Sequence, residues 1–292
     1  MATRQQETET HLDLVDGPGP LLTGRVALVT GGANGIGAGT AELFARHGAH
    51  VIVADIDRDG SDRVVDAIGA AGGSAESVVT DVRSDDDVRS LADEVHRRHG
   101  ALDVLVNNVG HWVAHLGDFV DGGPDHWRDL YAVNVHHVFT VTHAFLPAMI
   151  ERGRGSIINV SSIEGMRGYP AEPVYGAFKA AVVQFTKCLA VQVGNHGVRV
   201  NGIGPDVTES VQVPYSSWLP PEQQTRWPQW VPVGRMGHAI DQARVVLFLA
   251  SDLSAFVTGL TIPTDGGTAA AGGWFRSTTR PGRTWTNRPL DP

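Results

Sequence analysis

Tyr175 and Lys179 lie four residues apart in a stretch, residues 174–193, whose apolar positions predict a helix. At that spacing the phenol and the ammonium project from one helical face, one turn apart. A neighbouring cation favours the phenolate, so we expect Lys179 to lower the pKa of Tyr175 toward working pH. Ser162 follows a predicted strand, residues 156–160, and its hydroxyl could donate a hydrogen bond to a carbonyl or alcohol oxygen. The three side chains could therefore move a proton to or from such an oxygen.

A Tyr–Lys pair at helical spacing also arises by chance, so its meaning depends on the rest of the chain. A predicted strand over residues 25–30 runs directly into a glycine-rich loop, Gly31 to Gly37, and then into a helix over residues 38–47. Glycines let the backbone approach a pyrophosphate, whose charge is met by the N–H groups that begin the helix. This is the strand, loop and helix order of a dinucleotide-binding unit.

Asp55 supplies the next part of that unit. It ends a predicted strand over residues 50–54, 18 residues after Gly37. A carboxylate there can accept hydrogen bonds from the adenosine ribose hydroxyls and would repel a 2′-phosphate. Arg58 is the nearest cation, and none lies in the loop or immediately after Asp55. The sequence therefore favours NAD over NADP.

Strands and helices alternate along most of the chain. Further strands are expected at residues 74–80, 102–106, 198–201 and 260–263. The pattern predicts an α/β fold: a single doubly wound, Rossmann-type parallel sheet with helices on both faces. We expect a flexible arm at residues 1–21, one catalytic domain at 22–267 and an extension at 268–292. Residues 206–237, rich in Pro and Trp, are either a substrate loop or lid, or a rigid surface loop.

Composition limits the possible partners and location. The 292 residues carry 23 basic and 32 acidic side chains, a net charge of −9, which argues against binding nucleic acid or an anionic membrane. The one cysteine, Cys188, precludes an internal disulfide and indicates a reducing compartment, so we expect the cytoplasm. Cys188 stands in an apolar helical pattern and is expected to be buried. We expect no signal peptide and no membrane span.

The thirteen histidines show no metal-ligand spacing, so no metal is predicted. His136 and His137 are adjacent and would point in different directions on a helix.

Taken together, four motifs resemble the classical short-chain dehydrogenase/reductase family. They are Thr30-Gly31-x-x-x-Gly35-x-Gly37, Asn107-Asn108-x-Gly110, Ser162, and Tyr175-x-x-x-Lys179, in the family's order and at its separations. The likeness runs from about residue 24 to residue 267. It implies a homotetramer built through the helices at 125–150 and 175–194, and a nicotinamide cofactor that carries the hydride chemistry.

The resemblance also implies a role for each matching residue. The catalytic set would be Asn134, which holds a relay water, Ser162, which orients the substrate oxygen, Tyr175 as the acid and base, and Lys179, which binds the nicotinamide ribose. The cofactor would contact Gly31, Asn34, Gly35, Ile36, Gly37, Asp55, Asp81, Val82, Asn108, Gly110, Tyr175, Lys179, Pro205 and Thr208. Two positions depart from the family: Val109 replaces the usual alanine, and Asp206 replaces the glycine usual after Pro205, in the segment that leads to Thr208.

The substrate is a small molecule whose pocket is expected to be mostly aromatic or apolar, which suits a cyclic or bulky hydrophobic alcohol or ketone. The pocket candidates are His111, Trp112, Glu164, Met166, Tyr169 and the loop from Val211 to Trp230, which contains Trp218. Glu164 and His111 could bind a second polar group of the substrate, or could be solvated or structurally paired. We therefore expect an NAD-dependent enzyme that interconverts a secondary alcohol and a ketone. The alternatives are a cis-diol dehydrogenase, a 3-oxoacyl thioester reductase, or a non-catalytic NAD-sensing or scaffold protein.

Overall fold

The computed structural model describes residues 19–111, 118–276 and 285–286. A seven-stranded sheet crosses the molecule, with every strand parallel to its neighbours and the order β3-β2-β1-β4-β5-β6-β7. The strands are β1 (Val26–Thr30), β2 (His50–Asp55), β3 (Ser74–Val79), β4 (Val104–Asn107), β5 (Gly155–Val160), β6 (Val198–Pro205) and β7 (Thr261–Thr264). The predicted doubly wound parallel sheet is confirmed.

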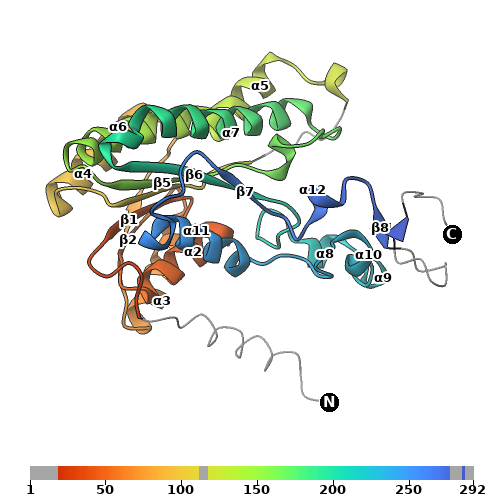
Figure 1. Cartoon of the computed structure of the whole chain (residues 1–292), viewed down its shortest axis with the longest axis horizontal. Coiled ribbons are helices and arrows are strands. Elements are labelled where there is room, and N and C mark those ends of the chain that lie inside the picture. The colour runs from red at the N-terminus through yellow and green to blue at the C-terminus, as the bar shows by residue number, and fades with distance from the viewer. Residues whose placement is uncertain (1–18, 112–117, 277–284, 287–292) are drawn as a thin grey trace.

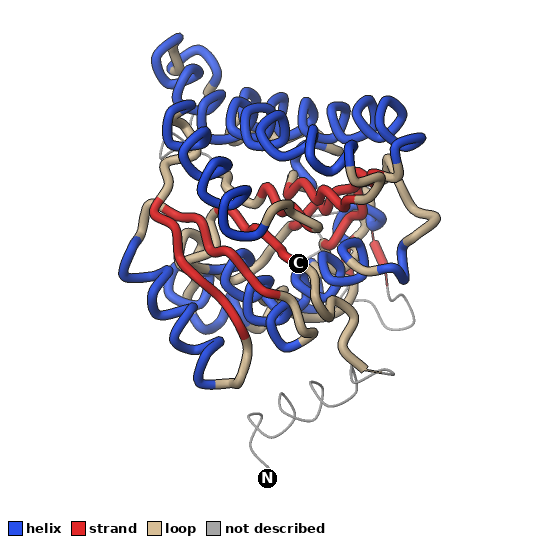
Figure 2. Tube along the Cα trace, turned by 90° about the vertical axis from the view of Figure 1, so that its left-hand side faces the viewer, coloured by secondary structure: helices blue, strands red, loops and turns tan. Residues whose placement is uncertain are grey.

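Helices cover both faces, so the domain has three layers (Figures 1 and 2). One face carries α2 (Gly35–Arg46), α3 (Arg58–Ala70) and α11 (Ala239–Ala250), and the other carries α4 (Asp85–His99), α6 (His137–Glu151) and α7 (Pro173–Val193). Strand β1 shows why the strands read as continuous apolar runs. Ala27 and Val29 face the α2 and α11 core, whereas Leu28 faces the α4, α6 and α7 core. Residues buried on both faces leave no polar alternation in the sequence.

The strand order reverses between β1 and β4. In doubly wound sheets, ligands bind outside the carboxyl ends of the strands at this point of reversal. Buried amides tie the middle of the sheet together below it. Asn107 donates to Asn159 at 2.9 Å and to Thr142 at 3.0 Å, and Asn159 donates to Thr186 at 2.9 Å. These bonds join β4 and β5 to α6 and α7, so the elements that carry the site residues are held in fixed relation.

One continuous helical segment departs from regular α-helical geometry. Helix α5 (Pro124–Tyr131) continues through η2 (Ala132–His136), which is a π-helix, into α6. A π segment inside an α-helix is rare and frequently marks a functional site. Asn134 lies in it.

The 206–237 loop folds into three short helices, α8 (Tyr215–Trp218), α9 (Pro221–Gln224) and α10 (Trp227–Trp230). They pack through their rings: Trp227 stacks on Trp230 at 5.6 Å and meets Tyr215 edge-on at 5.8 Å. The tail continues through α12 (Thr268–Ala271) to β8 (Phe275–Arg276), which pairs with β9 (Trp285–Thr286). The remaining short turns are η1 (Phe119–Asp121), η3 (Ile163–Gly165), η4 (Gly194–His196) and η5 (Asp252–Ser254).

One sequence prediction is corrected by the fold: Cys188 is exposed, because it lies on the side of α7 that faces away from the sheet. The stretch Pro173–His196, which contains α7, is long and apolar enough to cross a membrane by length and composition, a weak indication that core helices also give. His50, Glu76 and His99 meet in space, a grouping that the spacing of the histidines along the sequence did not reveal.

Candidate active site

Helix α7 carries the Tyr175 and Lys179 pair. Pro173 occupies its first turn, and the Glu172 carboxylate accepts the Val174 N–H at 3.3 Å, so the helix begins just before the tyrosine. Lys179 is only 3% exposed, and its Nζ donates to the Val160 carbonyl at the end of β5. That Nζ lies 5.6 Å from the centre of the Tyr175 ring. The predicted pairing of the two side chains on one helical face is present.

Ser162 reaches the same place from β5. Its Oγ accepts the Glu164 N–H at 3.2 Å and thereby caps η3, and it lies 3.5 Å from the Pro205 carbonyl at the end of β6. The Ser162 hydroxyl also interacts with the Tyr175 phenol and lowers the pKa of that phenol. The phenol and the serine hydroxyl therefore face one point in space, where a substrate oxygen could accept from both.

The segment after Ser162 packs directly on the backbone of α7. A Cβ added at Gly165 would lie 2.5 Å from the carbonyl carbon of Lys179, so only glycine permits this approach. Ser161 adds a hydrogen bond to the Lys179 carbonyl at 2.8 Å. These two contacts fix the positions of Tyr175 and Lys179 relative to Ser162.

Burial dominates the electrostatics of the pair. It raises the pKa of Tyr175 above its usual value of 10, while the Ser162 hydrogen bond lowers that pKa by a smaller amount. Burial also lowers the pKa of Lys179 to about 8. The prediction that Lys179 brings the Tyr175 pKa down toward neutrality is wrong for this structure, because the phenol loses more by desolvation than it gains. Tyr175 is thus protonated at neutral pH and is ready to act as an acid.

Asn134 has a clear structural task. It is fully buried in η2, where its Oδ1 accepts the His111 N–H at 3.1 Å and its Nδ2 donates to the His111 carbonyl at 2.7 Å. A second bond from Nδ2 reaches the Leu130 carbonyl at 2.9 Å. Asn134 therefore holds the chain just after Gly110, and its predicted role as a water holder stays a prediction.

The glycine loop has the shape of a phosphate cradle. A Cβ on Gly37 would lie 2.0 Å from the Gly31 carbonyl oxygen, so no other residue fits the turn. Asn108 Nδ2 donates to the Gly31 carbonyl at 3.0 Å, which joins the loop to the end of β4. Asp55 accepts the Ala33 N–H at 3.1 Å from the same loop. The residues present therefore fit the dinucleotide that the sequence implies.

The other predicted cofactor residues are engaged as follows. Asn34 Nδ2 donates to Asp57; Ile36 lies in the first turn of α2; the backbone of Gly35 faces Ser210; Asp81 pairs with Arg83; Val82 is buried; Pro205 faces Ser162; and Thr208 accepts from Gln242 at 2.9 Å. Ser210 belongs to the 206–237 loop, and its Cβ would lie 3.3 Å from a Cβ on Gly35. The loop therefore reaches the glycine loop as well as the substrate side.

A cluster of charged side chains lies beside Ser162, and the sequence did not predict that these residues would meet. Arg167 Nη2 contacts Glu164 at 2.8 Å and Asp206 at 3.1 Å, and Asp206 also accepts from the Thr268 hydroxyl. Glu164 is thus structurally paired, as one of its two readings anticipated. Asp206, which departs from the family pattern, joins β6 to both Arg167 and α12.

The structure places the remaining pocket candidates as follows. Tyr169 meets Tyr175 edge-on at 6.0 Å, and His111 is half-buried with its pKa lowered by burial. Met166 is 37% exposed, and Trp218 is 54% exposed on α8, near Tyr215. Trp112 lies outside the described residues.

The motifs did not single out His137, which also belongs to the site. It is fully buried, and burial followed by the charge of Lys179 lowers its pKa to about 3, so the imidazole is neutral. His136 points the other way and contacts Asp85 at 2.9 Å, as the adjacent positions predicted. The sequence shows that His136 and His137 are adjacent, but it does not show that His137 is buried.

Known proteins are similar to this chain over most of its length. Residues 31–269 match the family model described as enoyl-(acyl carrier protein) reductase. A 3-oxoacyl-[acyl-carrier-protein] reductase of Thermotoga maritima is 37% identical over 246 residues, covering 84% of this chain and 98% of the relative. A 2,5-dichloro-2,5-cyclohexadiene-1,4-diol dehydrogenase of Sphingobium indicum is 38% identical over 249 residues, covering 84% and 96%. The structure of a 7α-hydroxysteroid dehydrogenase with NADH and 7-oxo glycochenodeoxycholic acid superposes with a TM-score of 0.78 at 32% identity, covering 84% and 94%.

The close contact between Gly110 and Lys179 gives a test of the site. A Cβ on Gly110 would lie 2.5 Å from Lys179 Nζ and 3.3 Å from Asn134 Oδ1. Gly110→Ala should therefore displace the ammonium and weaken NADH binding about 10- to 100-fold, measured by fluorescence titration. Gly168→Ala is the matched control, since nothing lies within 4 Å of its Cβ. Equal affinities for the two variants would contradict this account of the site.

Proposed function

The chain belongs to the classical short-chain dehydrogenase/reductase family, and from that premise we propose that it is an NAD-dependent oxidoreductase that interconverts a secondary alcohol and a ketone. The proposed substrate is a cyclic or bulky hydrophobic small molecule, such as a steroid, a terpenoid or a ring alcohol. One observation carries the proposal: the Tyr175 phenol and the Ser162 hydroxyl face one point, with the buried Lys179 ammonium behind them. A scaffold protein would not need this costly buried charge.

The residues divide the work of ketone reduction. When bound, NADH supplies the hydride from its nicotinamide C4. Ser162 donates a hydrogen bond to the ketone oxygen; its contact with Pro205 is long, at 3.5 Å, and is easily exchanged. Tyr175 gives its proton to the same oxygen as negative charge develops there. Lys179 holds the ribose hydroxyls and stabilises the phenolate that remains. Alcohol oxidation uses the same groups in reverse.

Asp55 supports the choice of NAD. Its carboxylate lies at the end of β2 and is aimed at the glycine loop by the N–H groups of Ala33 and Asp57. The neighbouring side chain, Ile56, is 62% exposed and apolar, so it brings no positive charge to meet a 2′-phosphate. Hydrogen bonds from the ribose hydroxyls to a carboxylate are of the stronger, charge-assisted kind.

The choice of substrate rests on the wall around Tyr175. Tyr169 and the partly buried Tyr215 supply aromatic surface, which suits a ring system. A cis-diol dehydrogenase is the second candidate, because the cluster of Glu164, Arg167 and Asp206 beside Ser162 offers partners for a second hydroxyl. Reduction of a 3-oxoacyl thioester on an acidic carrier protein is less attractive, since the net charge of this chain is −9.

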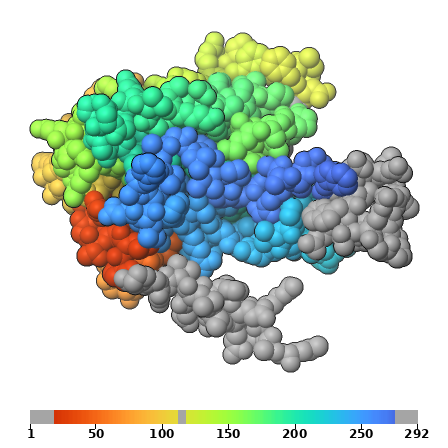
Figure 3. All heavy atoms as spheres, viewed as in Figure 1, coloured from red at the N-terminus to blue at the C-terminus, as the bar shows by residue number. Residues whose placement is uncertain are grey.

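The oligomer and location are proposed with the activity. The side of α7 that faces away from the sheet carries Val191, 86% exposed, and the adjoining helical segment carries Tyr131 and Phe139, 40% and 37% exposed. In Figure 3 the yellow-to-green atoms of these helices lie along the top of the molecule. Burial of such apolar side chains favours a homotetramer formed through these helices. The single cysteine supports a cytoplasmic location.

A substrate panel tests the function. Wild type and Tyr175→Phe are assayed by NADH absorbance with cyclic, aromatic, steroidal and short aliphatic secondary alcohols and the matching ketones, and the assays are repeated with NADP. We expect turnover of ring substrates, at least about 10-fold preference for NAD, and a loss of about 100-fold or more in the Phe variant. NAD binding without turnover of any substrate would favour a sensing or scaffold role instead.

The pKa shifts predict how the two directions depend on pH. Ketone reduction needs protonated Tyr175 and charged Lys179, so its kcat/KM should stay level to about pH 8 and fall above it, as Lys179 loses its proton. Alcohol oxidation needs proton loss from Tyr175, whose pKa is raised, so its kcat should climb through the alkaline range. Lys179→Arg, which stays charged, should remove the fall in reduction. A kcat/KM for reduction that rises between pH 8 and pH 10 would contradict the roles given to protonated Tyr175 and charged Lys179.

A further inference from the structure

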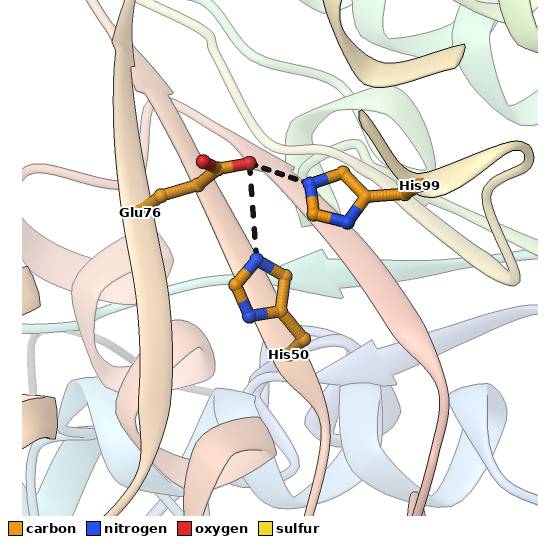
Figure 4. A group of neighbouring side chains, drawn as sticks. All are labelled: His50, Glu76 and His99. Carbon is orange, nitrogen blue, oxygen red and sulfur yellow. Dashed lines mark hydrogen bonds and ion pairs between the residues drawn. The ribbon is translucent and has the colours of Figure 1, made fainter. Parts of the chain in front are cut away.

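His50, Glu76 and His99 come from three elements but meet at one point (Figure 4). His50 begins β2, Glu76 is the third residue of β3, and His99 ends α4. Strands β2 and β3 are parallel, with His50 opposite Ser74 and Ile52 opposite Glu76. Alternate residues face the same side, so His50 and Glu76 share the face that α4 covers. The last residue of α4 then closes the group.

We propose that these three side chains bind one divalent transition-metal ion of the zinc class, which ties β2, β3 and α4 together. Glu76 Oε1 is the common point: it lies 2.6 Å from His99 Nε2 and 3.8 Å from His50 Nε2. Ligand atoms from all three side chains lie within 4.8 Å of one another. Around a tetrahedral zinc ion, ligand atoms about 2 Å from the metal lie about 3.3 Å apart. Small side-chain rotations would bring this triad to that spacing.

The surroundings orient the ligand atoms. His50 Nδ1 lies 2.7 Å from Ser74 Oγ, and when it donates there its Nε2 keeps a free lone pair. That Nε2 is buried and has no hydrogen-bond partner within the described part of the chain. The other carboxylate oxygen of Glu76 is held by Arg98, which also contacts Glu94 at 3.0 Å. Oε1 of Glu76 is therefore left to face the two imidazoles.

An imidazole binds a metal through the free nitrogen of its neutral form. Burial, and then the neighbouring His99, lower the pKa of His50. The charged groups around it are Glu76, Arg98 and Glu94. Arg98 partly offsets the carboxylate, so we expect a site of moderate affinity. The rings of His50 and His99 lie 4.8 Å apart and are tilted by 36°, so both can approach one ion from different sides.

The donor set selects the kind of ion and its purpose. Two imidazoles and one carboxylate favour Zn²⁺, Co²⁺, Ni²⁺ or Cu²⁺ over Mg²⁺ and Ca²⁺, which prefer oxygen ligands. His50 begins the strand that Asp55 ends, so the site lies about 16 Å from the cofactor end of β2. At that distance the ion would stabilise the edge of the sheet and take no part in proton transfer.

Metal binding to the full-length protein tests the proposal. Chelator-treated protein is titrated with ZnCl₂ by calorimetry, and its thermal unfolding is followed with and without Zn²⁺. We expect one equivalent bound and a rise in Tm of about 5 °C at saturation. His50→Ala and His99→Ala should lose both effects, whereas His196→Ala, an exposed histidine elsewhere, should keep them.

Cobalt provides a second reading that does not depend on stability. Co²⁺ bound to His50, Glu76 and His99 should give visible absorption bands that Glu76→Gln weakens and His50→Ala removes. The proposal is overturned if no Zn²⁺ binds, or if the stoichiometry, the Tm shift and the cobalt bands are the same in His50→Ala as in wild type. The latter result would mean adventitious binding at surface histidines.

Discussion

The burial of one ammonium, that of Lys179, constrains the whole centre of the molecule. Its Nζ reaches the Val160 carbonyl, and Gly110 must lack a side chain to leave it room. Its own backbone is met by Gly165 and Ser161 from the loop after β5. These contacts therefore fix the position of helix α7 relative to the end of β5 and the segment after β4. That placement brings Tyr175 and Ser162 to a single point.

Burial of the Lys179 ammonium costs free energy in the absence of the cofactor. Lowering the Lys179 pKa from 10.5 to about 8 corresponds to about 3 kcal/mol of lost ammonium solvation. The hydroxyls of a bound ribose would return acceptors to this charge, so cofactor binding and the charging of the site are coupled. Tyr175 shows the other side of the same burial, because its raised pKa keeps it protonated until negative charge develops on a substrate oxygen. Tyr175 therefore keeps its proton until the reaction requires it.

The sequence predicted the parts of the structure that depend on local pattern. Continuous apolar runs located the buried strands, and the spacing of Tyr175 and Lys179 placed both on one helical face. It did not predict what depends on distant neighbours. The Tyr175 pKa follows from burial by several segments, and Arg167 meets Asp206 across 39 residues. His50, Glu76 and His99 come together only through strand register and the end of a helix. Cys188 shows that an apolar pattern does not say which face of α7 is covered.

The central claim is that this site passes a hydride between the nicotinamide C4 and a carbonyl carbon while Tyr175 passes a proton to the oxygen. The most direct measurement uses NADH carrying deuterium on either face of C4, a ketone that the enzyme reduces, and mass spectrometry of the alcohol. We expect one deuterium on the carbinol carbon from one of the two labelled cofactors, with the hydroxyl proton drawn from solvent. An alcohol whose carbinol hydrogen comes from solvent, with neither labelled cofactor giving up its deuterium, would contradict it.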